Sequence, residues 1–251
     1  MAAVPVAVLT RPPVPWRALV AVGLTLFTGQ FLFQFFGMAK GMPPGLAAIV
    51  VQTQAIFTIA LAALALGEAP SRRQVVGIAS AVAGLLAIAQ TTGHDLTLVG
   101  LGLSLLAAVS WALGNLLLKR LPPVSMRDLV VWLSLVPPLP ALLLSLVLDG
   151  PSGFARALGA LTWPAIVAVL YLGGVATVLA YAIWGDLLRR YPAATVTPFA
   201  LLVPFVAAYA SSLVFGERFG GLRLLGMALV LLGLAVIVLP WPRPRSGTLH
   251  A

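Results

Sequence analysis

The chain has 251 residues, of which 61% are hydrophobic and only 8% are charged, with a mean hydropathy of +1.08 and a formal net charge of +9. A soluble domain carries about 25% charged residues, so the charges here are too few to cover a globule of this size in water. The composition excludes an ordinary soluble protein and predicts an integral protein of the lipid bilayer. The absence of cysteine excludes disulfides and thiolate metal sites, and the two histidines, His94 and His250, fall in a loop and in the tail.

Eight apolar runs follow one another along the chain, each long enough to cross the hydrocarbon as a helix of about 20 residues. They cover residues 17–38, 43–66, 72–91, 97–118, 128–148, 163–187, 193–215 and 221–240. Short joints rich in proline, glycine and charged residues separate them. Before the third run, Ser71 and Gln74 have the spacing of a capping box, which predicts a helix start. We therefore expect an all-α polytopic membrane protein with eight transmembrane helices.

The basic residues are divided unequally between the two sides of the membrane. If successive runs cross in alternate directions, eleven of the 15 lysines and arginines fall on one side and four on the other. Because cytoplasmic loops carry the excess of basic residues, the richer side is predicted to be cytoplasmic, together with both chain termini. This distribution explains the net charge of +9 without a nucleic-acid partner.

A four-residue pattern occurs twice, displaced by 149 residues. Its members are Gly67, Glu68, Gly77 and Gly84 in the first copy and Gly216, Glu217, Gly226 and Gly233 in the second. Five runs separate equivalent points, and five is odd, so the two glutamates fall on opposite sides of the membrane. The copies are therefore predicted to be inverted relative to each other, as in many transporters, with chance similarity between glycine-rich helices as the alternative. We expect the glycines to allow close helix packing and the glutamates to form hydrogen bonds at helix ends.

The two predicted repeats differ in length. Residues 94–242 hold five runs, whereas residues 1–93 hold three complete runs after an apolar stretch too short to cross a membrane. That stretch has no basic region before it, so it fits the end of a span better than a signal peptide. We interpret residues 1–93 as an incomplete first repeat and residues 243–251 as a cytoplasmic tail. Either the chain begins at an internal Met of a longer gene product, or it is a genuine eight-span variant.

Polar side chains inside the apolar runs are candidates for a transport pathway, because such groups are costly in hydrocarbon. Gln30 and Gln34 lie one turn apart on the first run, and Gln52 and Gln54 fall near the middle of the second. In the second copy the corresponding region contains Pro204, which frees a backbone carbonyl inside the span. Matched irregularities in two halves indicate a transport site, although hydrogen bonding between packed helices would also explain the glutamines.

Two further groups of polar and aromatic residues lie in the second predicted repeat. Trp111 and Asn115 are one turn apart, and Thr177, Tyr181 and Trp184 align on one helix face. An aromatic face with hydroxyls suits small amphipathic solutes. For Trp184 an anchor at the membrane interface is the alternative.

Recognisable catalytic motifs are missing from the sequence. It contains no G-x-S-x-G, no H-E-x-x-H and no P-loop, so we expect neither an enzyme nor a cofactor, and ATP does not power the chain directly. Asp186 is the one carboxylate near a span interior and is a candidate for proton coupling, unless it reaches the cytoplasmic interface.

Several stretches together resemble a known family. They are "GMPPGLAAIVVQTQAIFT", "LGE" with its spaced glycines, "SWALGNLLLKR" and "YLGGVATVLAYAIWGDLLRRY". The chain resembles the EamA family of the drug/metabolite transporter superfamily, and within it the O-acetylserine/cysteine exporters. The likeness covers nearly the whole chain, but residues matching the first helix and most of the second are missing.

The resemblance implies ten helices in two inverted five-helix repeats around a central cavity. It implies export of small metabolites such as O-acetylserine and cysteine across the bacterial inner membrane by alternating access, driven by an ion gradient, with a proton as the coupling ion. Other readings stay open. The same fold could carry a drug, an aromatic amino acid or a nucleobase, or the chain could be an inactive fragment, an assembly subunit or part of a homo-oligomer.

Overall fold

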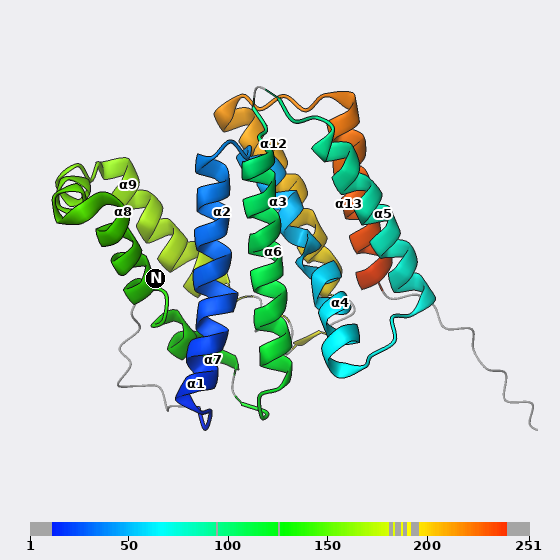
Figure 1. Ribbon diagram of the computed structural model, residues 1–251, viewed down its shortest axis with the longest axis horizontal. Coiled ribbons are helices and arrows are strands. Elements are labelled where there is room, and N and C mark those ends of the chain that lie inside the picture. Colours follow the sequence, from blue (N-terminus) through cyan, green and yellow to red (C-terminus); the bar gives the residue numbers. More distant parts are fainter. Residues whose placement is uncertain are drawn as a thin grey trace, which may run out of the picture.

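The computed structural model describes residues 12–93, 95–124, 126–180, 183, 187, 190–191 and 196–239, with the side chains of 126, 127, 177, 178, 197 and 198 excepted. Helices connected by short loops make up this part of the chain (Figure 1). The all-α prediction is confirmed. The predicted capping box is confirmed as well, because Ser71 Oγ accepts a hydrogen bond from the Gln74 N–H while Gln74 Oε1 accepts one from the Ser71 N–H.

The elements alternate between regular α-helix and short segments of π- or 3₁₀-helix. The first half contains α1 (Trp16–Val22), the π-helix η2 (Gly23–Gly29), α2 (Gln30–Ala39), α3 (Pro44–Val50), the 3₁₀-helix η3 (Val51–Thr53), α4 (Gln54–Leu66), α5 (Arg72–Ala89) and α6 (Leu98–Lys119). The second half contains α7 (Met126–Ser134), α8 (Pro138–Gly159), α9 (Trp163–Leu170), the π-helix η4 (Tyr171–Leu179), the 3₁₀-helix η5 (Thr197–Leu201), α12 (Leu202–Phe215) and α13 (Gly221–Val238).

Every predicted apolar run is represented by helix in the structure. Six helical segments are long and apolar enough to cross a membrane: Trp16–Ala39, Pro44–Leu66, Arg72–Ala89, Leu98–Lys119, Asp128–Gly159 and Gly221–Val238. Two shorter apolar segments, Trp163–Ala176 and Phe199–Phe215, lie in the sixth and seventh predicted runs. The chain is a polytopic membrane protein.

The fifth run differs from a simple span in two places. The helix is interrupted between Ser134 and Pro138, where consecutive prolines remove backbone donors. Helix α8 then continues beyond the predicted end of the run, with a break at Gly150, whose φ is 69°. The sequence around Gly150 and Pro151 reads as a loop, yet proline is well suited to the first turn of a following helix, and the chain coils again to Gly159.

Helices α5 and α13 lie side by side and antiparallel, with glycines at the contact (Figure 1). A Cβ atom added to Gly77 would lie 2.6 Å from the carbonyl oxygen of Gly233, and one added to Gly84 would lie 2.5 Å from that of Gly226. Both distances are shorter than real Cβ contacts, so the two backbones touch where side chains would normally separate them. The two glycine pairs exchange places under the 149-residue displacement, which means that a local two-fold relation connects the helices.

The boundaries of the helices are also related by the 149-residue displacement. Helix α5 (Arg72–Ala89) and helix α13 (Gly221–Val238) begin and end 149 residues apart. The glycines that precede them, Gly67 and Gly216, both have left-handed backbones, with φ of 67° and 66°. The π-helices η2 and η4 overlap under the displacement, and so do the 3₁₀-helices η3 and η5. The two copies therefore share their irregularities as well as their glycines, while the residue limits of the predicted repeats stay a prediction.

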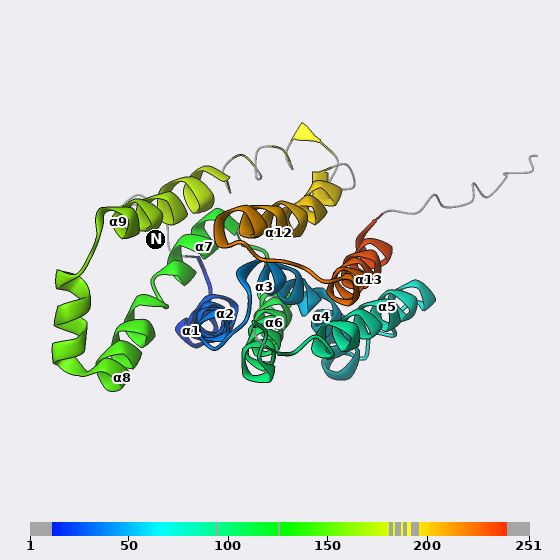
Figure 2. The same cartoon turned by 90° about the horizontal axis from the view of Figure 1, so that it is seen from above.

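Buried hydrophobic side chains form two cores that hold the helices together. The larger core joins α3, α5, α6 and α13, and the smaller one joins α1 to α7. Helices α8 and α9 extend away from the other helices, with many exposed apolar side chains (Figure 2). In a membrane these exposed apolar surfaces are suited to contact with lipid.

Candidate functional site

Helix α6 packs against both α2, which carries Gln30 and Gln34, and α4, which begins at Gln54. The contact of η2 and α2 with α6 is close because Gly29 of η2 and Gly37 of α2 face serines of α6. A Cβ added to Gly37 would lie 2.9 Å from Ser104 Oγ, and Ser110 Oγ donates a 2.7 Å hydrogen bond to the carbonyl oxygen of Thr25. Small residues on facing helices permit this spacing inside a membrane.

A polar network connects α4 to α6 at the end of the 3₁₀-helix η3. The side-chain amide nitrogen of Asn115 donates to Gln54 Oε1 at 3.0 Å and to Thr58 Oγ1 at 3.3 Å. Thr58 Oγ1 in turn donates to the backbone carbonyl oxygen of Gln54 at 2.7 Å. All three side chains are partly buried, in helices that carry no charged residue before Lys119 at the end of α6. The structure thus brings two of the sequence candidates, Gln54 and Asn115, into direct contact.

Four further candidates lie on α2, η3 and α6, and among the described residues none of them is hydrogen-bonded to this network. Gln30 is 4% exposed in the first turn of α2. One turn later, Gln34 has a buried Oε1 atom that finds no hydrogen-bond partner among the described residues. Gln52 lies within η3, and Trp111 lies half-buried on α6, one turn before Asn115. An unpaired buried carbonyl is costly, which favours an additional partner at Gln34 such as water or cargo.

The remaining candidates of the second copy lie between residues 177 and 204. Pro204 is buried in the first turn of α12, directly after the 3₁₀-helix η5. The backbone of Thr177 lies in the π-helix η4, whereas its side chain is outside the described part of the structure. Tyr181 and Trp184 also lie outside the described residues, as do His94 and Asp186.

The glutamates of the repeated pattern have different partners at the two ends of the molecule. Glu217 accepts hydrogen bonds from the Gly45 N–H at 3.2 Å through both carboxylate oxygens, and from Ser211 Oγ at 2.5 Å. It therefore satisfies the first turn of α3, where a carboxylate is favoured by the helix dipole. Glu68 instead forms an ion pair with Lys119, and both side chains are about half exposed.

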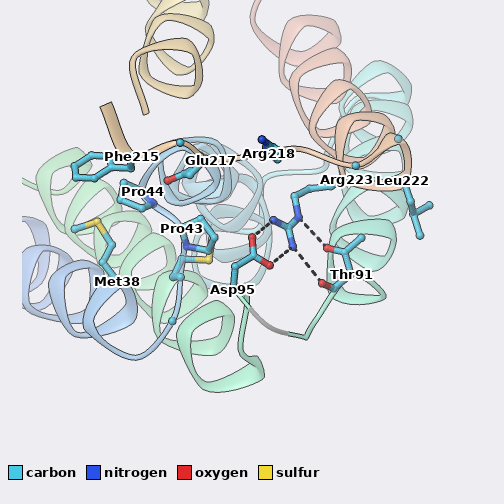
Figure 3. A pocket seen from close by; sticks show the side chains of 15 residues that line it. Met38, Pro43, Pro44, Thr91, Asp95, Phe215, Glu217, Arg218, Leu222 and Arg223 are labelled. Carbon is cyan, nitrogen blue, oxygen red and sulfur yellow. Dashed lines mark hydrogen bonds and ion pairs between the residues drawn. The ribbon is translucent and has the colours of Figure 1, made fainter. Parts of the chain in front are cut away.

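A hollow of about 840 Å³ opens beside Glu217, among loops that all fall on the predicted outer side (Figure 3). Its lining includes Met38, Pro43, Thr91, Asp95, Phe215, Glu217 and Arg223. Arg223 is only 6% exposed, and its guanidinium forms two hydrogen bonds with the Asp95 carboxylate and two with Thr91. The hydrogen bond from Arg223 holds the pKa of Asp95 below its ordinary value of 3.8.

Arg223, Asp95 and Thr91 are therefore bonded to one another, and they fasten the α5–α6 loop to the start of α13. Sequence reasoning missed this clamp, because nothing in the local pattern connects Arg223 with a residue 128 positions earlier. It also missed Thr58, although its place one turn after Gln54 could have indicated a shared helix face. Among the described residues, no cluster of three or more histidine, aspartate or glutamate side chains could hold a metal ion.

The model of the EamA-like transporter family matches residues 1–90 and 98–239. A protein named "Probable amino-acid metabolite efflux pump" from Salmonella typhimurium is 42% identical over 236 residues, which are 92% of this chain and 79% of the relative. The protein of the same name from Escherichia coli is 40% identical over the same shares. A "Probable terminal-alkyne amino-acid exporter" from Streptantibioticus cattleyicolor is 30% identical over 203 residues, or 78% of this chain and 64% of the relative.

Proposed function

The chain belongs to the EamA-like transporter family, and on that premise we propose that it exports amino-acid derivatives such as O-acetylserine and cysteine across the bacterial inner membrane. The names of three relatives, two efflux pumps for amino-acid metabolites and one amino-acid exporter, support small amino-acid derivatives as the cargo. Family and relatives alike are described as transporters rather than enzymes.

The observation that carries the proposal is the pairing of irregular helix segments in the two copies. A π-helix and a 3₁₀-helix occur in each copy at matching positions, and Gln54 directly follows the 3₁₀-helix η3. Interrupted helices in corresponding positions of two inverted halves are the best pointer to a transport site, because the interruptions expose backbone groups where cargo binds. We propose that the two copies alternate around this region, which opens it to each side of the membrane in turn.

The chemistry of the network fits a cargo without net charge. The network of Gln54, Thr58 and Asn115 offers amide and hydroxyl groups but no full charge. A zwitterionic amino acid has no net charge, and amide and hydroxyl groups supply hydrogen-bond donors for its carboxylate and acceptors for its ammonium group.

Both termini and the arginine-rich loops are proposed to lie in the cytoplasm. Outward transport is proposed because the relatives are named efflux pumps and an exporter. A proton gradient is proposed as the driving force, since the sequence contains no motif for ATP.

Flux measurements in vesicles test this proposal. Purified protein reconstituted into liposomes should release preloaded O-acetylserine or cysteine faster than empty liposomes, and the flux should saturate. A panel containing a drug, an aromatic amino acid and a nucleobase distinguishes the other cargo classes. Absence of protein-dependent flux for every cargo, with and without a proton gradient, would overturn the proposal and favour an assembly subunit or an inactive chain.

A further inference from the structure

The orientation of the Asn115 amide is determined by the hydroxyl of Thr58. A threonine hydroxyl has a single hydrogen, and that of Thr58 is donated to the backbone carbonyl oxygen of Gln54 at 2.7 Å. Towards Asn115, 3.3 Å away, Thr58 Oγ1 can therefore only accept. The atom that Asn115 presents to Thr58 must be its NH2 group, because its oxygen would face another acceptor.

The orientation of the Asn115 amide in turn determines the orientation of the Gln54 amide. The NH2 group of Asn115 has two hydrogens, one for Thr58 Oγ1 and one for Gln54 Oε1 at 3.0 Å. Gln54 consequently presents its oxygen to Asn115 and keeps its own NH2 group on the other branch of the amide. In the described part of the chain no partner is recorded for that NH2 group or for the Asn115 side-chain oxygen.

The network thus leaves two donor hydrogens on Gln54 available at the end of the 3₁₀-helix. We propose that Thr58 and Asn115 are positioning residues that hold the Gln54 amide with its NH2 group available to the cargo, so that the transporter prefers a cargo with a carboxylate. This inference rests on the proposed function and specifies its cargo. A donor fixed in advance binds a carboxylate without the cost of reorienting, and a reversed amide would place an oxygen against the negative charge.

The second copy does not repeat this network. The positions 149 residues after Gln54 and Thr58 are Val203 and Ala207, neither of which can hydrogen-bond through its side chain. The second copy therefore has no side-chain amide at the position of Gln54, although the helix interruptions occur in both copies.

A graded series of variants tests the inference in reconstituted vesicles, by comparing the KM for an amino acid with the KM for its uncharged-end analogue, the amino-acid amide. Thr58→Ser retains the hydroxyl and should retain the preference of the wild type. Thr58→Val removes it, so both orientations of the amide pair have equal hydrogen bonding and the productive one falls to about half, which raises the KM for the acid about twofold. The maximal rate and the KM for the amide should not change.

Asn115→Asp should change the KM for the acid more than Thr58→Val does. An ionised aspartate only accepts, so Gln54 must turn its NH2 group towards it and present Oε1 to the cargo. The KM for the acid should then rise about tenfold or more, whereas the amide should bind at least as well as before. Equal preferences in Thr58→Val and Thr58→Ser, or equal changes in both KM values, would overturn the inference while leaving the exporter intact. Absence of flux by the wild type would overturn the proposed function itself, and thermal unfolding of each purified variant identifies any loss caused by misfolding.

Discussion

The hydroxyl of Ser80 donates a 2.9 Å hydrogen bond to the backbone carbonyl oxygen of Leu229, the residue that occupies the equivalent position 149 residues later. A residue can meet its own counterpart only near the two-fold axis that relates the copies. The axis therefore passes between α5 and α13, midway between the glycine pairs on either side. The repeated glycines are thus explained by one requirement, which is that the two copies of one helix cross closely enough for backbone contact.

The close contact of α5 and α13 predicts the effect of adding a single methyl group. In Gly84→Ala the new Cβ would lie 2.5 Å from the Gly226 carbonyl oxygen and 2.8 Å from the Val230 nitrogen, and neither backbone atom can move aside cheaply. We expect a loss of about 1–3 kcal/mol of stability, measured by unfolding in detergent. Gly102→Ala is the matched control, since nothing lies within 4 Å of its added Cβ, and it should be neutral or slightly stabilising. Equal effects of the two substitutions would contradict the packing role.

The unequal surroundings of the two repeated glutamates predict unequal costs of neutralising them. Glu217→Gln removes the charge that the Gly45 N–H and the Ser211 hydroxyl satisfy, and should lower the stability by about 1–2 kcal/mol. Glu68→Gln affects only a half-exposed ion pair with Lys119 and should cost less than about 0.5 kcal/mol. Both variants are compared by thermal unfolding in the same detergent. A larger loss in Glu68→Gln would show that the ordering is wrong.

The outer clamp predicts a pH dependence of stability. Because the pKa of Asp95 in the folded protein lies below its ordinary value of 3.8, the contribution of this carboxylate is complete above pH 3.8 and is lost as the pH falls through the lower folded pKa. Asp95→Asn should be less stable than the wild type near neutral pH by about 1 kcal/mol, a modest value because the Asp95 side chain is about half exposed.

The difference between Asp95→Asn and the wild type should shrink in acid, which unfolding curves recorded from about pH 7 to about pH 3 would reveal. Asp149→Asn, a change of the same kind at an exposed carboxylate that accepts from Ser145, is the control and should stay close to the wild type throughout. A constant difference over the whole range for Asp95→Asn would argue against a role for its ionisation.

The cysteine-free sequence allows the predicted orientation to be tested with single-cysteine variants. Ala69 and Ser152 are both exposed, the first in a joint predicted to be cytoplasmic and the second in one predicted to be outside. A membrane-impermeant thiol reagent applied to intact cells should label Ser152→Cys but not Ala69→Cys, and lysis should make both reactive. The reverse labelling would show that the orientation inferred from the basic residues is wrong.

Much of the fold could be predicted from the sequence because the membrane imposes simple rules. The apolar runs are long, and their joints contain proline, glycine and charged residues, so the order of the helices could be predicted. The break near Pro138 is explained by consecutive prolines, which remove backbone donors from the helix. The helical turns beyond Gly150 could not be predicted from the sequence, because a Gly-Pro pair is equally compatible with a loop and with a kink between two helices.

The candidate site was less accessible to sequence reasoning. Gln54 and Asn115 could be selected because amides are rare inside apolar runs. Their contact depends on the crossing of α4 and α6, and the sequence carries no local signal of it. Thr58 was not identified as a candidate, because threonine in a span commonly forms a hydrogen bond with its own helix backbone. Thr58 also forms such a bond here. The π- and 3₁₀-helices depend on tertiary packing, and no characteristic amino-acid composition marks them in the sequence.

The most direct test of the transport assignment is the efflux of labelled O-acetylserine from vesicles containing either the wild type or Gln54→Ala. The assignment predicts saturable efflux by the wild type, and a KM raised about tenfold in Gln54→Ala because the cargo loses a charge-assisted hydrogen bond. Efflux of the same size from vesicles with the wild type, with Gln54→Ala and without protein would contradict it.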